Sequence, residues 1–154
     1  MALFETMKYK VIKKEKNIEI REYEDILLAS TKTFMNEKQD TGFMNVFNYI
    51  SGNNNKNEKI SMTTPVVTYK EKDVLVTGFY VPSKYDKESI PKPKEEVFIN
   101  ELKKSLYGVI KFKGSWKDKN YDKHDQILID YLLDNNYDIL SARLIFRYQP
   151  PFIP

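Results

Sequence analysis

The stretch from Phe43 to Val66, FMNVFNYISGNNNKNEKISMTTPV, constrains the fold more than any other part of the chain. Its apolar residues recur at i, i+3, i+4 and i+7, namely Phe43, Val46, Phe47 and Ile50. This spacing predicts an amphipathic helix over residues 42–50. Gly52 is a natural helix stop, because glycine adopts left-handed backbone conformations without a steric penalty. After a polar loop, Pro65 has no amide proton to donate, so it fits the start of a strand.

The chain before this helix has the pattern of short strands, at residues 9–13, 18–23 and 27–34. A polar tetrapeptide separates the first two runs, which predicts a hairpin. In the second run the apolar residues alternate with Glu19 and Arg21, which predicts one buried face and one solvated face. Asp40 and Thr41 are candidate N-caps for the helix that follows.

The chain after Pro65 repeats this order of elements. It predicts strands at 66–69, 74–81, 97–99, 106–113 and 142–148, and a second helix at 121–135. The run 74–81 is apolar on both faces and therefore fits a central strand. The apolar face of the second helix consists of Ile127, Leu128, Tyr131 and Leu132. Residues 82–96 form a charged linker that contains several prolines.

These elements predict an α+β fold, in which an antiparallel sheet, or a distorted barrel, carries two amphipathic helices. The order strand, helix, Asn-rich stop, strand occurs twice. We therefore interpret the chain as one domain of two pseudo-repeated halves, about 7–81 and 97–149, joined by the linker 82–96.

Composition excludes several classes of function. The chain has 154 residues, no cysteine, one histidine and a net charge of +3. These values argue against a disulfide framework and against nucleic-acid binding. No stretch is apolar for long enough to span a membrane, so we expect a cytoplasmic protein. No hydrolase motif or phosphate-binding loop is present, so we do not expect an enzyme.

Several residues have both a structural and a functional interpretation. The helix face with Phe43 and Phe47 fits a core position, and it also fits the wall of a pocket for a flat apolar ligand. His124 is a candidate metal ligand or a polar residue of the second helix. Met44 and Met62 are candidate thioether ligands or packing residues. Arg143 and Arg147 are candidates to bind a carboxylate ligand, or they form ion pairs at the surface.

The segments YISGNN (49–54) and KISMTTPV (59–66) resemble the signature of the SOUL haem-binding protein family, Y-I-x-G-x-N followed by K-I-x-M-T-x-P-V. Further segments resemble the family in the same order. They are YKVIKKEKNIEIREY (9–23), FYVP with PKP (79–82 and 91–93), FKG (112–114) and YQPPF (148–152). The resemblance covers essentially the whole chain.

This resemblance implies a fold of two pseudo-repeated halves, which form a distorted antiparallel barrel flanked by two helices. It also implies non-covalent binding of b-type haem or a free porphyrin, for buffering or carriage, by a monomer. The implied pocket is shallow and apolar and runs along the first helix near the Pro-Pro segment. Its lining here would be Phe43, Val46, Phe47, Ile50, Phe152 and Ile153.

Two departures from the family pattern concern the residues that would contact haem. The basic residues that contact the haem propionates in other members correspond here to Asp40 and Ile153, with Lys38 or Lys32 as candidate substitutes. The axial histidine of some members has no counterpart, because the N-terminal half contains no histidine. A second hypothesis is therefore a module that binds other amphipathic small molecules, as effector-binding domains of related architecture do.

Overall fold

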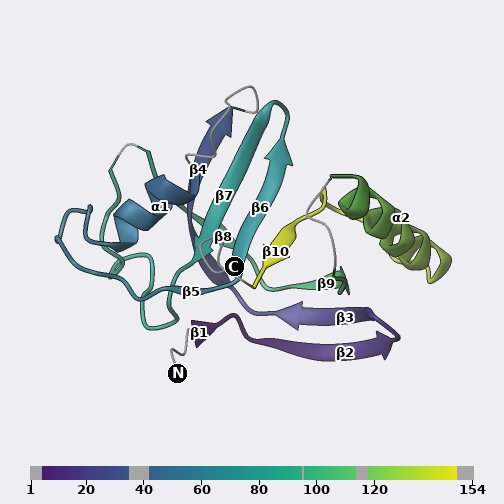
Figure 1. Ribbon diagram of the computed structural model, residues 1–154. Helices are drawn as coiled ribbons and strands as arrows, with labels where there is room; N and C mark the ends of the chain where they lie inside the picture. The colour runs from purple at the N-terminus through teal and green to yellow at the C-terminus, as the bar shows by residue number, and fades with distance from the viewer. Residues whose placement is uncertain (1–4, 35–41, 95, 114–117, 149–154) are drawn as a thin grey trace. The chain divides into compact units, whose positions relative to one another are not determined.

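The computed structural model describes residues 5–34, 42–94, 96–113 and 118–148, and in them the chain forms ten strands and two helices (Figure 1). The strands are β1 (Glu5–Thr6), β2 (Tyr9–Glu15), β3 (Ile18–Tyr23), β4 (Ile26–Phe34), β5 (Thr63–Thr64), β6 (Val66–Glu71), β7 (Val74–Tyr80), β8 (Phe98–Leu102), β9 (Ser105–Ile110) and β10 (Ile145–Arg147). The helices are α1 (Gly42–Ile50) and α2 (Asp118–Asp134). The predicted α+β class is confirmed.

The chain divides into two compact units that are interleaved in sequence. The first contains Met1–Met7, Asp25–Lys103 and Leu144–Pro154, and the second contains Lys8–Glu24 and Lys104–Arg143. Each unit has its own sheet and its own helix. The predicted pseudo-repeat of the two sequence halves stays a prediction.

The first unit is built on an antiparallel sheet with the strand order β10-β6-β7-β4-β8. Helix α1 covers the face that carries Ala29 of β4 and Phe79 of β7, which are directly opposite each other in the sheet. The central strand β7 is buried on both faces, as its pattern predicts, since the neighbouring residues Val76 and Thr77 are both buried. The two-residue strands β1 and β5 pair in parallel beside this sheet.

The second unit is an antiparallel sheet with the order β2-β3-β9, and α2 packs on it. The close approach of helix and sheet requires a glycine. A Cβ atom added at Gly108 of β9 would lie 2.7 and 2.8 Å from the two Cδ atoms of Leu132 on α2. Leu132 is the buried member of the predicted apolar face, whereas Ile127 is exposed.

Most predicted elements lie where the sequence places them, with three corrections. The described sheets are open and do not close into a barrel, because the edge strands β10 and β8 of the larger sheet do not pair with each other. The strand predicted at 142–148 is limited to Ile145–Arg147. Arg143 just before it forms ion pairs with Asp122 and Asp125 on α2, which confirms the ion-pair interpretation of this arginine.

The third correction concerns β3, in which Glu19 and Arg21 are buried rather than solvated. Glu19 is 4% exposed and Arg21 is 3% exposed. The Arg21 guanidinium donates to the Glu19 carboxylate (2.7 Å) and to the Tyr23 hydroxyl (2.9 Å), and it lies 3.9 Å from the ring centre of Tyr9. The second face of β3 is therefore covered by paired charges and aromatic rings instead of water.

Candidate functional site

Helix α1 buries one side and exposes the other. Val46, Tyr49 and Ile50 are buried in a core cluster with Ala29 and Phe79. Phe47, at the edge of this buried side, is 38% exposed, and Met44, further round the helix, is 52% exposed. The predicted apolar stripe is therefore split between the core and the surface.

The signature loop after α1 is held in place by the side chain of Asn54. Its amide nitrogen donates to the carbonyl oxygens of Tyr49 (3.1 Å) and Glu58 (2.8 Å). Its amide oxygen accepts from the backbone N–H groups of Lys56 (3.1 Å) and Glu58 (3.2 Å). Because all of its amide hydrogen-bonding groups are used inside the loop, Asn54 has a structural role.

The same loop is fastened to the segment around Pro91. The Tyr49 hydroxyl donates to the Pro91 carbonyl (2.5 Å), and the Lys92 N–H donates to the Asn55 side chain (2.6 Å). Burial raises the pKa of the Tyr49 hydroxyl, so this hydroxyl stays a hydrogen-bond donor. Further along, the Thr63 hydroxyl donates to the Tyr80 carbonyl. The motif residues thus connect α1, the loop 82–94 and β7.

A shallow apolar crevice runs between α1 and the sheet. It is lined by Val46, Phe47 and Ile50 of α1, by Met62, and by Val66, Thr77, Gly78 and Phe79 of the sheet. Three of the six predicted pocket residues therefore lie together. The enclosed space is about 10 Å³, which is close to the minimum needed for one water molecule. A ligand larger than water would have to lie across the exposed edge of α1 rather than inside the crevice.

Buried hydroxyl groups lie on the sheet face that α1 covers, and sequence reasoning missed them. Thr68 and Thr77 are directly opposite each other on β6 and β7 and are both buried. Their hydroxyl oxygens have no hydrogen-bond partner among the described residues. No sequence signal distinguishes them from other strand threonines.

The other predicted site residues are placed less completely. The position of Phe43 within α1 is described but its side chain is not. Phe152, Ile153, Asp40 and Lys38 lie outside the described residues. Lys32 is directly opposite Val76 on the sheet face away from α1, where its ammonium lies 5.7 Å from the Phe98 ring centre. Lys32 is therefore not placed to replace the basic residues along α1.

The surroundings of His124 are described within the second unit. In the described part of the chain, no group of three or more His, Cys, Asp or Glu residues could hold a metal ion. The His124 Nδ1 atom is 2.8 Å from the Asn120 carbonyl oxygen, and its ring stacks on Phe112 at 4.0 Å between ring centres. This carbonyl oxygen can only accept, so the proton of this hydrogen bond is on Nδ1. His124 belongs to the second unit, whereas Met44 belongs to the first.

Neither described helix combines the length and the apolar character that crossing a membrane requires.

Comparison with known proteins places the chain in a family. A search of curated proteins found no match. The family model described as SOUL heme-binding protein matches residues 4–154, which is nearly the whole chain. The match includes the segments YISGNN and KISMTTPV, and the Asn54 side chain in the first of them holds the loop between the two segments by hydrogen bonds. The chain therefore belongs to the SOUL heme-binding protein family.

Proposed function

We propose that this protein binds haem or a related porphyrin without a covalent bond, along the exposed edge of α1, for buffering or carriage and without catalysis. The observation that carries the proposal is the exposure of Phe47 and Met44 on a helix whose other face is fixed in the core. Membership of a heme-binding family supports the ligand class. A macrocycle face laid on this edge gains about 25 cal/mol per Å² of apolar surface removed from water.

The residues present fit such a ligand by apolar contact, and they offer little to its iron. Met44 is the described thioether on α1, and thioethers are weak ligands. We therefore expect modest affinity and ready exchange, and we expect haemin and metal-free porphyrin to bind with similar affinity. Phe43, Phe152 and Ile153 complete the proposed contact surface.

The test is a titration of the protein with haemin, followed by the Soret band. We expect a saturable shift for the unchanged protein. Phe47→Asp should bind haemin with at least tenfold lower affinity, because the ligand would have to desolvate a charge at this exposed edge. Leu140→Asp is the matched control, since Leu140 is an exposed apolar residue of the second unit. The proposal would be refuted if the unchanged protein gave no saturable shift, or if Phe47→Asp and Leu140→Asp bound haemin with equal affinity.

A second candidate function is the binding of another amphipathic small molecule at the same edge. It is favoured by the position of Lys32 on the opposite sheet face, which leaves the propionates of a haem without that cation. Tighter binding of an apolar dye such as 8-anilinonaphthalene-1-sulfonate than of either porphyrin would support this alternative. Loss of the Soret band under reductant and oxygen, faster than with free haemin, would instead indicate catalysis.

A further inference from the structure

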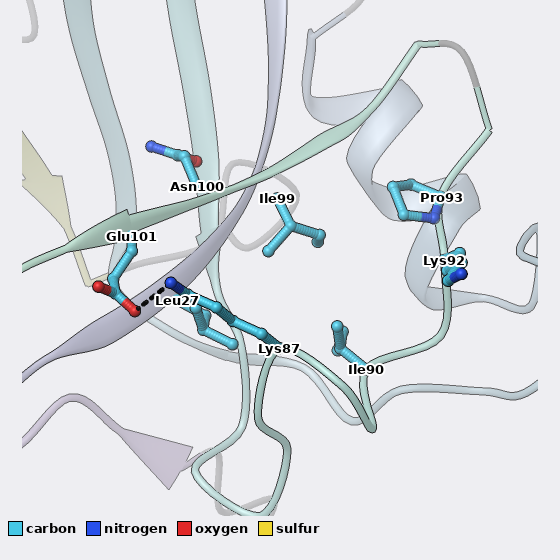
Figure 2. A pocket seen from close by; sticks show the side chains of 8 residues that line it. All are labelled: Leu27, Lys87, Ile90, Lys92, Pro93, Ile99, Asn100 and Glu101. Atoms are coloured by element: carbon cyan, nitrogen blue, oxygen red, sulfur yellow. Dashed lines mark ion pairs between the residues drawn. The ribbon is translucent and has the colours of Figure 1, made fainter.

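The first unit contains a second cavity, separate from the crevice at α1 (Figure 2). It has a volume of about 320 Å³, which is at the lower end of the roughly 300–1,000 Å³ typical of small-molecule sites. Residues from β4, β8 and the loop 82–94 line it. None of these lining residues belongs to the lining of the α1 crevice.

The floor of this cavity is apolar and fixed. Leu27 and Ile90 are buried members of the core cluster, and Ile99 packs against the same cluster. In Figure 2 the Ile99 and Ile90 side chains point toward each other from β8 and from the loop. Within the loop, the Ile90 N–H donates to the Asp86 carbonyl. The loop is also joined to α1, because the Tyr49 hydroxyl donates to the Pro91 carbonyl. The floor is therefore preformed.

The rim carries more positive than negative charge. The Lys87 ammonium is 3.2 Å from the Glu101 carboxylate (Figure 2), and Glu101 also forms an ion pair with Lys103. Hydrogen bonds from Lys103 and Lys87 hold the pKa of Glu101 below its ordinary value. Two lysines therefore share the single carboxylate of Glu101.

Lys92 supplies the second positive charge of the lining. Its ammonium has no ion-pair partner among the described residues, whereas its backbone is fixed by two hydrogen bonds to Asn55, of 2.6 and 3.0 Å. Because Glu101 is shared between two lysines, the lining carries a net positive charge. Charge complementarity therefore selects an anion, and the apolar floor selects an anion with a hydrocarbon body.

We propose that this cavity is a second ligand site, which takes a small amphipathic carboxylate. The hydrocarbon body of the ligand lies on Leu27, Ile90 and Ile99, and its carboxylate contacts Lys92. The site is independent of the haem proposal, since it shares no residue with the crevice at α1. The small volume assigns it to a short-chain ligand rather than to a macrocycle.

The probe is sodium octanoate, followed through the methyl NMR signals of Leu27, Ile90 and Ile99. We expect saturable shifts of these signals, and weaker binding of 1-octanol and of octylamine, which have the same chain without the negative charge. Lys92→Gln should weaken octanoate binding roughly tenfold, because a hydrogen bond to a charged partner is lost. Lys94→Gln is the matched control, since Lys94 is an exposed residue of the same loop outside the lining.

Ile99→Phe gives a second readout, because the larger ring fills the space above the floor. We expect it to abolish octanoate binding while leaving the haemin titration unchanged, which separates this site from the one at α1. Absence of saturable shifts overturns the proposal, as does equal octanoate affinity of Lys92→Gln and Lys94→Gln. Shifts confined to Val46 and Ile50 of α1 would also overturn it, since they would place the ligand at the other site.

Discussion

At the scale of single residues, the described part of the chain contains buried hydroxyl groups that have no hydrogen-bond partner there. One of them is the Thr77 hydroxyl. A buried hydroxyl in this state costs about 1–3 kcal/mol. Valine has nearly the same shape and no polar atom to desolvate. We therefore predict that Thr77→Val raises the free energy of unfolding by about 1 kcal/mol, measured by urea denaturation.

Thr63→Val is the matched control for this prediction. The Thr63 hydroxyl is buried but donates to the Tyr80 carbonyl, so its removal should lower the free energy of unfolding by about 1 kcal/mol. The same change in stability for both variants would contradict the assignment of Thr77 as an unpaired hydroxyl.

Glu19 gives a pH-dependent prediction at the same scale. Burial alone raises the pKa of the Glu19 carboxyl, but the hydrogen bond and charge of Arg21 and the charge of Lys111, at 3.4 Å, outweigh it, so the pKa lies below its ordinary value. A carboxyl with a lowered folded-state pKa stabilises the fold above the unfolded-state pKa, about 4.3 for glutamate. This contribution is lost as the pH falls through the folded-state pKa.

We therefore predict that unfolding of the native protein becomes easier below about pH 4, as measured by denaturant melts at several pH values. Glu19→Gln should be less stable at pH 7, because it leaves the Arg21 guanidinium buried without its charged partner. Its stability should also depend less on pH between about 2 and 5. An unchanged slope in Glu19→Gln would show that other carboxyl groups cause the acid dependence.

At the scale of elements, the contact between β9 and α2 depends on the missing side chain of Gly108. A Cβ at this position would meet the Leu132 methyl groups below 3.0 Å, so Leu132 would have to change its rotamer. Such overpacking costs about 1–3 kcal/mol, whereas replacing a glycine gains about 0.4–1 kcal/mol from the unfolded chain. We therefore predict that Gly108→Ala destabilises the second unit by about 1 kcal/mol.

A double-mutant cycle with Leu132→Ala checks this mechanism. Since Leu132→Ala removes the atoms that the new Cβ would meet, Gly108→Ala should cost less in that background and become nearly neutral. Additive costs in the cycle would mean that the glycine is needed for its backbone rather than for space.

The sequence predicted elements well where the signal is local, and poorly where it depends on distant residues. Both bounds of α1 match, because the apolar spacing and Gly52 lie within the same few residues. The burial of Glu19 and Arg21 was missed because alternating charge looks the same whether the partner is water or the ring of Tyr9. Likewise, the charged segment 82–96 concealed Ile90, whose burial depends on contacts with α1 and β4.

At the scale of the whole molecule, the sequence predicted the class and the family and could not predict the interleaved units. The division arises because β3 pairs with β9 and β4 pairs with β8, although each pair is far apart in the chain. The sequence of one strand does not indicate which distant strand it pairs with. The candidate site was predicted in part for the same reason, since Val46 and Ile50 belong to one helix whereas Thr77 reaches them only through the fold.

The pairing of β3 with β9 has a consequence for synthesis of the protein on the ribosome. The Asn17 side chain donates to the Lys111 carbonyl, and these residues are 94 positions apart. Synthesis proceeds at about 5–20 residues per second, so roughly 5–20 s pass between the synthesis of the β2–β3 hairpin and that of its third strand, β9. Throughout that interval the inner edge of β3 has open hydrogen-bonding groups, which are a template for pairing with other chains. Until β9 is synthesised, the nascent hairpin is thus open to pairing with other chains.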